Sequence, residues 1–118
     1  MPLSRLKSPK LGHKDIQDIL DALLAHILSV VQPIDVILIG SYLRGEADEF
    51  SDIDLVVIVN DGKDPSATHF ALVRDRPFRE RPLDLIVLNQ SDFDKMCDVG
   101  GIAFEAKNHG KSLLKKGG

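Results

Sequence analysis

Residues 40–55 of the chain read Gly40-Ser41-Tyr42-Leu43-Arg44-Gly45-Glu46-Ala47-Asp48-Glu49-Phe50-Ser51-Asp52-Ile53-Asp54-Leu55. The Gly-Ser pair that opens this stretch follows the apolar run 34–39, so it marks the place where a buried strand ends and a turn begins. Backbone N–H groups in such a turn are available to phosphate oxygens. The sequence therefore predicts a phosphate-binding turn at Gly40 and Ser41, ahead of a second strand.

Two aspartates open that second strand. Residues i and i+2 of a strand point to the same face, so Asp52 and Asp54 are expected to project together. Asp84 interrupts a later apolar run, 82–88, which reads as a third strand. If the third strand neighbours the second, it adds a third carboxylate to the same face, and the three negative charges repel one another. A hard divalent cation would offset this repulsion, and Mg²⁺ that keeps substrate phosphate in its coordination shell fits best.

These segments together resemble a known family. The minimal nucleotidyltransferases of the DNA polymerase β superfamily share the pattern Gly-Ser, a spacer of this size, Asp-hydrophobic-Asp-hydrophobic and a distal Asp on a following strand. The segments of this chain that are similar to the family's core, third-acid strand and closing segment are 44–47, 51–55, 82–87 and 109–114. Tyr42 is a departure, because many members carry Arg directly after the Ser, and Arg44 must then supply the positive contact to phosphate.

The resemblance implies a fold, a reaction and a set of residues. The fold is of the α/β (α+β) class, a small mixed β-sheet with helices packed on one face, as in polymerase β-type nucleotidyltransferases. The reaction is the transfer of a nucleoside monophosphate, AMP from ATP, to a hydroxyl acceptor with release of pyrophosphate, and it uses two Mg²⁺ ions or Mn²⁺. The catalytic and metal-binding residues are Asp52, Asp54 and Asp84. The nucleotide-binding residues are Gly40, Ser41 and Arg44.

Simpler roles remain open for several of these residues. The Ser41 hydroxyl could cap its own turn, which is compatible with phosphate binding. Arg44 could form a solvent-exposed ion pair with Glu46 or Asp48 instead of contacting phosphate, an arrangement that contributes little stability. Acids next to strands often serve only to protect a sheet edge, so Asp52 and Asp54 could also be structural.

A second reading comes from another functional class. The chain could be an interaction module, the antitoxin half of a pair with a helical HEPN-type ribonuclease toxin, which it neutralises by binding or by AMPylation. The presence of all three acids favours catalysis over pure binding. A domain that uses its sheet face for nucleotide and metal has little surface left to cover the acceptor. We therefore expect a homodimer or a heteromer with a small helical HEPN-type protein.

Composition indicates a single small domain. The 118 residues suffice for one hydrophobic core, and we expect a flexible N-terminal tail, 1–12, followed by one domain, 13–118. The net charge of −3 and the aromatic content of 5% argue against nucleic-acid binding. The single Cys97 cannot form an internal disulfide, and no apolar stretch approaches the length of a membrane helix. A cytoplasmic location is the resulting expectation.

Periodicity and turn chemistry give the expected elements. An amphipathic helix is predicted over 14–31, and strands over 34–40 and 53–59 flank the turn 41–51. The segment 60–66 reads as a loop, while 67–80 shows no clear pattern. After the third strand, Ser91 is expected to cap a helix that starts near Asp92, and glycines at 100 and 101 separate it from a helical piece over 102–108.

Overall fold

The computed structural model describes residues 13–47, 51–77 and 82–114. The predicted N-terminal tail, 1–12, lies outside the described residues. The helices are α2 (His13–Val30), α3 (Ser41–Arg44), α4 (Pro65–Arg74), α5 (Gln90–Met96) and α6 (Gly101–His109). The strands are β1 (Asp35–Ile39), β2 (Ile53–Val59), β3 (Leu83–Asn89) and β4 (Lys111–Ser112). No helix of the described residues is long and apolar enough to cross a membrane.

The four strands form one mixed sheet in the order β3-β2-β1-β4. β1 is antiparallel to both β2 and β4, whereas β2 and β3 are parallel. A parallel pair needs a crossover connection between its strands, and α4 provides it. The predicted α+β class with a small mixed sheet is confirmed.

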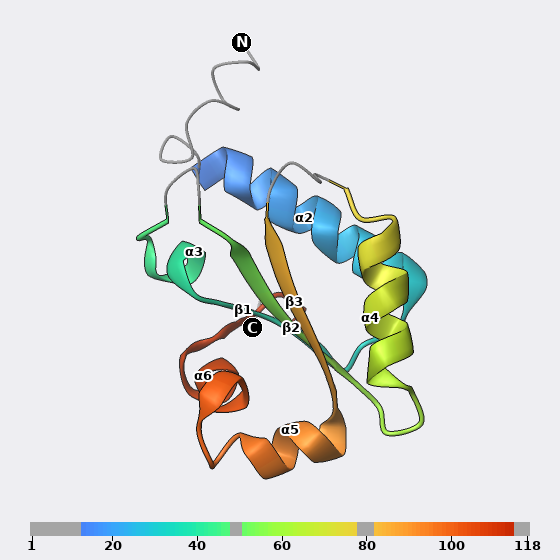
Figure 1. The fold of residues 1–118 in the computed structure, drawn as a ribbon. Coiled ribbons are helices and arrows are strands. Elements are labelled where there is room, and N and C mark those ends of the chain that lie inside the picture. Colours follow the sequence, from blue (N-terminus) through green and yellow to red (C-terminus); the bar gives the residue numbers. More distant parts are fainter. Residues whose placement is uncertain (1–12, 48–50, 78–81, 115–118) are drawn as a thin grey trace.

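One face of the sheet is covered by α2 and α4 (Figure 1). The predicted amphipathic helix is α2, which buries Ile19, Leu23 and Ile27 at three- and four-residue spacing. These side chains pack on alternate residues of the strands, among them Val36 and Leu55, both fully buried. This cluster is the larger part of the core.

The other face is covered by α5 and α6, so the expectation of helices on one face is wrong in this respect (Figure 1). Phe93 and Cys97 of the α5 end, with Ala103 and Ala106 of α6, form a second buried cluster against the sheet. The physical reason lies in the central strands. All five residues of β1 are buried, which requires cover on both faces.

The segment without a clear sequence pattern is α4, which begins inside the predicted loop. Asp64 is its N-cap, because its side chain accepts a hydrogen bond of 3.0 Å from the Ser66 N–H, and Pro65 occupies the first helical position. Only Thr68 and Leu72 of α4 are buried. Two buried residues give too weak a periodicity for the helix to be recognised.

The helix predicted near Asp92 is α5, but its cap is not Ser91. The Asn89 side chain accepts a hydrogen bond of 2.9 Å from the Asp92 N–H. Both the N–H and the hydroxyl of Ser91 donate instead to the Asp61 carboxylate in the loop after β2. The break at the two glycines is confirmed, since α6 starts at Gly101 with Gly100 as its N-cap.

Candidate active site at the end of the parallel strand pair

Gly40 forms the turn between β1 and α3. Its φ of 85° and ψ of −159° lie in a region that is open almost only to glycine. The Gly40 carbonyl accepts hydrogen bonds from the N–H groups of Leu43, at 3.1 Å, and Arg44, at 3.2 Å. A Cβ at this position would overlap with the Asp54 carboxylate. The Gly-Ser turn and the second aspartate are therefore in direct contact, and Ser41 follows as the first residue of α3.

The sheet register brings two of the three predicted acids side by side. Asp54 is the register partner of Asp84 in the parallel β2–β3 pair, and of Ile39 in the antiparallel β1–β2 pair. Neighbouring strands lie about 4.8 Å apart, so the two aspartates start from adjacent backbone positions. Both lie on the α5–α6 face, because Val56 and Ile58, which follow Asp54 at even spacing, belong to the cluster beneath α5 and α6. The second and third strands are thus neighbours, which is the condition under which the sequence places Asp84 on the same face as Asp54.

Asp52 completes the acidic group from just outside the strand. It precedes Ile53, the first residue of β2, and its side chain is exposed, as is that of Asp84. Asp54 is half-buried. The three acids thus share one end of the sheet, with Asp54 innermost.

The electrostatics of the group follow from this arrangement. Burial raises the pKa of the Asp54 carboxyl above its ordinary value, and the negative charges of Asp84 and Asp52 raise this pKa further. Arg44 acts in the opposite direction. The ionised form of Asp54 is therefore less favourable than that of a free aspartate, and a positive charge in the site would offset this effect.

Arg44 is held by two glutamates. Its Nε lies 2.9 Å from Glu46 Oε1, and its Nη1 lies 3.6 Å from Glu105 Oε2 on α6. The pair with Glu46 is the solvent-exposed ion pair that the sequence analysis gave as an alternative to phosphate binding. The hydrogen bond and charge of Glu46 raise the pKa of Arg44. Asp48, the other suggested partner, lies outside the described residues. Sequence reasoning missed Glu105, because nothing in the local pattern of α6 links this residue to a turn sixty residues earlier.

The acids have the right chemistry for a divalent cation but are not assembled around one. Within the described parts of the chain, no three His, Cys, Asp or Glu side chains form a group arranged to hold a metal ion. Carboxylate oxygens are the ligands that Mg²⁺ and Mn²⁺ prefer. Gly40 leaves space for the carboxylate of Asp54, and the exposed Asp52 and Asp84 are free of core packing. Such a donor set fits a cation that binds together with its substrate.

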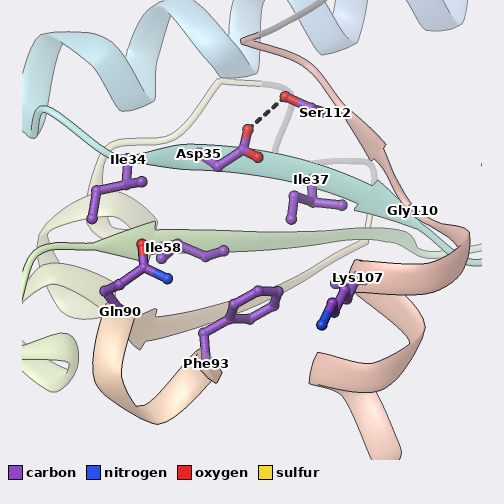
Figure 2. Close-up of a pocket in the computed structure, with 10 residues that line it drawn as sticks. Ile34, Asp35, Ile37, Ile58, Gln90, Phe93, Lys107, Gly110 and Ser112 are labelled. Carbon is purple, nitrogen blue, oxygen red and sulfur yellow. Dashed lines mark hydrogen bonds between the residues drawn. The ribbon is translucent and has the colours of Figure 1, made fainter. Parts of the chain in front are cut away.

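A cavity on the same sheet face lies away from the acids. It has a volume of about 310 Å³, and Gln90 and Phe93 of α5 and Lys107 of α6 face Ile37 and Ile58 across it (Figure 2). Asp35 lines it at the first residue of β1, where Ser112 donates a hydrogen bond of 2.5 Å to its carboxylate. The register pairs Asp35 with Ile58, four residues from Asp54, so the cavity and the acids occupy opposite ends of the strands.

A mixed sheet with a Gly-Ser turn at the end of one strand and acids at the start of two parallel ones defines a protein of the nucleotide-transferring class. The chain belongs to the nucleotidyltransferase domain family, whose model matches residues 17–112 and so includes the turn and all three acids. Members of this family generally use divalent metals. The resemblance inferred from the sequence is confirmed.

A crystal structure from Sulfolobus solfataricus, of a protein assigned as a nucleotidyltransferase, is similar with a TM-score of 0.49 and 22% sequence identity. The match covers 71% of this chain and 81% of that one. No curated protein matches the sequence.

Proposed function

We propose that the chain transfers a nucleoside monophosphate, AMP from ATP, to a hydroxyl acceptor in a reaction that depends on Mg²⁺ or Mn²⁺. The observation that carries this proposal is the register of β2 and β3, which places Asp54 beside Asp84 and next to the Gly40 turn. Nucleotidyl transfer needs a grip on the triphosphate and a group of acids at the reacting phosphorus, and this end of the sheet offers both.

Asp54 and Asp52 would hold the divalent cation, with Asp84 as a further ligand for it or for a second ion. The cation supplies positive charge to the triphosphate and makes an acceptor hydroxyl more acidic. The raised pKa of Asp54 supports this assignment, because a bound cation removes the repulsion among the three carboxylates. Glu105, which pairs with Arg44 and adds to the negative charge around Asp54, is not proposed as a ligand.

The protein groups then divide the reaction between them. The backbone of Gly40 and Ser41 would bind the triphosphate, and Arg44 would exchange part of its contact with Glu46 and Glu105 for a phosphate oxygen. The acceptor oxygen attacks the α-phosphorus, the bond from the α-phosphorus to the bridging oxygen breaks, and pyrophosphate leaves. Asp84 would take the hydroxyl proton, a role that its exposed side chain beside Asp54 supports.

The test is transfer of label from ATP that carries it at the α-phosphate. We expect labelled product and pyrophosphate only when Mg²⁺ or Mn²⁺ is present, and no transfer by Asp52→Asn or Asp54→Asn. Asp98→Asn is the matched control, since this exposed acid pairs with Lys107, away from the turn, and should leave transfer unchanged. Transfer that continues in Asp54→Asn would remove the assignment.

A second candidate function is binding of a helical HEPN-type partner, with or without AMPylation. It is favoured by apolar side chains that stay exposed at and after the end of α5 and on α6: Met96, Val99, Ile102 and Phe104. Val99 is 83% exposed, which is unusual for an apolar side chain that has no interface to cover. Coexpression of Asp54→Asn with a small all-helical toxin separates the two functions. Neutralisation by this variant means that binding suffices, and loss of neutralisation means that transfer is required.

A further inference from the structure

β3 forms an open edge of the sheet. It has seven residues and pairs with β2 alone among the described strands, whereas the opposite edge, β4, has only two. Proteins usually protect an edge strand with proline, lysine or a bulge, or keep it short. β3 (Leu83–Asn89) contains neither proline nor lysine, and its one charged residue is Asp84. Such an edge is suited to pair with another strand.

A groove follows this edge. It has a volume of about 350 Å³ and is lined by three consecutive strand residues, Leu85, Ile86 and Val87, and by the first half of α4 with His69. Side chains of consecutive residues point to opposite faces, so a groove that touches all three runs along the strand itself. The first half of α4, up to His69, therefore lies beside the middle of β3.

Phe70, the next residue of α4, is 65% exposed. The guanidinium of Arg74 lies 5.9 Å from the centre of the Phe70 ring. Among the described residues, the Phe70 ring makes no other aromatic or cation contact. An exposed aromatic side chain next to an open edge and a groove is typical of an interface residue.

We propose that two copies of the chain pair through this edge, with their β3 strands antiparallel about Ile86. In this register Leu85 lies opposite Val87 of the second copy, and Asp84 lies opposite Leu88. No two like charges face one another, so the strand is complementary to itself. The result is a continuous eight-stranded sheet with a two-fold axis at Ile86.

The same axis brings the two α4 helices together. A two-fold axis perpendicular to a sheet keeps each helix layer on its own face, so both copies of α4 lie on one side. Because His69 shares the groove with the middle of β3, His69 and the exposed Phe70 beside it would approach their counterparts in the second copy across the axis. Backbone hydrogen bonds at the edge and burial of Phe70 thus act in one interface. The pairing does not depend on the proposed nucleotide transfer.

Sedimentation of the full chain over a concentration series tests the pairing. We expect a dimer for the wild type, and a shift to monomer in Phe70→Glu with at least about a tenfold increase in the dissociation constant, because two carboxylates then meet at the axis. Val99→Glu is the matched control, since it places the same charge at an exposed apolar position of the α5–α6 turn and should not change the dimer. Circular dichroism confirms that both variants fold.

Cross-linking tests the register. Ile86→Cys faces itself across the axis and should form a disulfide-linked dimer on mild oxidation, while Val99→Cys should not. The native Cys97 is buried and does not interfere. If Ile86→Cys fails to fold, Phe70→Cys with a short bismaleimide replaces it. A wild type that is monomeric at every concentration overturns the proposal, whether or not another protein binds the edge. A dimer that Phe70→Glu leaves intact, or that links equally at position 99, overturns it as well.

Discussion

At the scale of single residues, the contact between Gly40 and Asp54 is the centre of the site. Gly40 adopts a backbone conformation that other residues rarely adopt, and the space where a side chain would stand is filled by the Asp54 carboxylate. This position therefore requires glycine both for its backbone conformation and for the space that the Asp54 carboxylate occupies. Any larger residue would move the acid that the proposed chemistry requires.

Gly40→Ala should therefore lower the free energy of unfolding by about 2–5 kcal/mol and weaken nucleotide binding. Gly45→Ala is the matched control. Gly45 also has a positive φ, 75°, but a Cβ there meets nothing within 4 Å, so the loss should be only about 1–2 kcal/mol with binding retained. Urea unfolding and calorimetry measure the two effects. Equal losses in both variants would show that the contact with Asp54 is unimportant.

Asp54→Asn should stabilise the metal-free chain at neutral pH. The pKa of Asp54 is raised in the folded state, so ionisation of its carboxyl destabilises the fold. Protonation of Asp54 reverses this destabilisation as the pH falls through the folded pKa towards 3.8, the ordinary value. The advantage of the asparagine variant should shrink over the same range. Thermal unfolding in chelator at several pH values measures it, and a variant that is less stable than wild type at neutral pH contradicts the prediction.

Asp84→Asn should reduce the rate of transfer more than the affinity for nucleotide. Its side chain is exposed next to Asp54 and is assigned to the acceptor hydroxyl, so its loss affects the transition state more than the bound nucleotide. Single-turnover rates and binding by calorimetry separate the two. Equal losses in rate and affinity would place Asp84 at the nucleotide and not at the acceptor.

The acids could be foreseen because their positions depend on rules that are local in sequence. The apolar runs that contain Asp54 and Asp84 predict strands, and the register of these strands makes the two acids neighbours. Asp52 comes directly before the strand, so the two-residue period of a strand does not apply to it. Glu105 could not be foreseen. Its place near Arg44 depends on how α6 packs on the sheet, which no local pattern specifies.

At the scale of the elements, caps decide where helices begin. The helix α4 buries only Thr68 and Leu72, so the hydrogen bond from the Ser66 N–H to Asp64 and the proline at its first position matter more than its apolar face. Asp64 and this proline lie in the segment 60–66, which the sequence analysis predicted to be a loop. Turn residues and N-cap residues are the same amino acids, and only the structure separates the two roles.

Asp64→Ala should therefore lower the free energy of unfolding by about 1 kcal/mol. Asp75→Ala is the control at the other end of α4. Asp75 forms an exposed ion pair of 3.3 Å with Arg74, and its loss should cost less than about 0.5 kcal/mol. Urea denaturation compares the two variants. An equal effect of both changes would mean that Asp64 is not a cap.

At the scale of the whole molecule, the sheet is covered on both faces, and the site lies at one end of it (Figure 1). Residues 36–39 of β1 form an apolar run, which is the pattern of a strand covered on both sides, whereas the burial of Asp35 does not follow from this pattern. The position of the second layer was not visible, because α5 and α6 are short and α6 packs only the small residues Ala103 and Ala106 against the sheet.

The proposed function requires that the end of the sheet at Gly40, Asp54 and Asp84 be a metal-dependent nucleotide site. Calorimetric titration of the chain with ATP, once with Mg²⁺ and once with chelator, tests it most directly. We expect binding with Mg²⁺ and none with chelator, because the carboxylates of Asp52, Asp54 and Asp84 repel a bare triphosphate, and we expect loss of binding in Asp54→Asn. ATP affinity that is the same with chelator as with Mg²⁺ would contradict it.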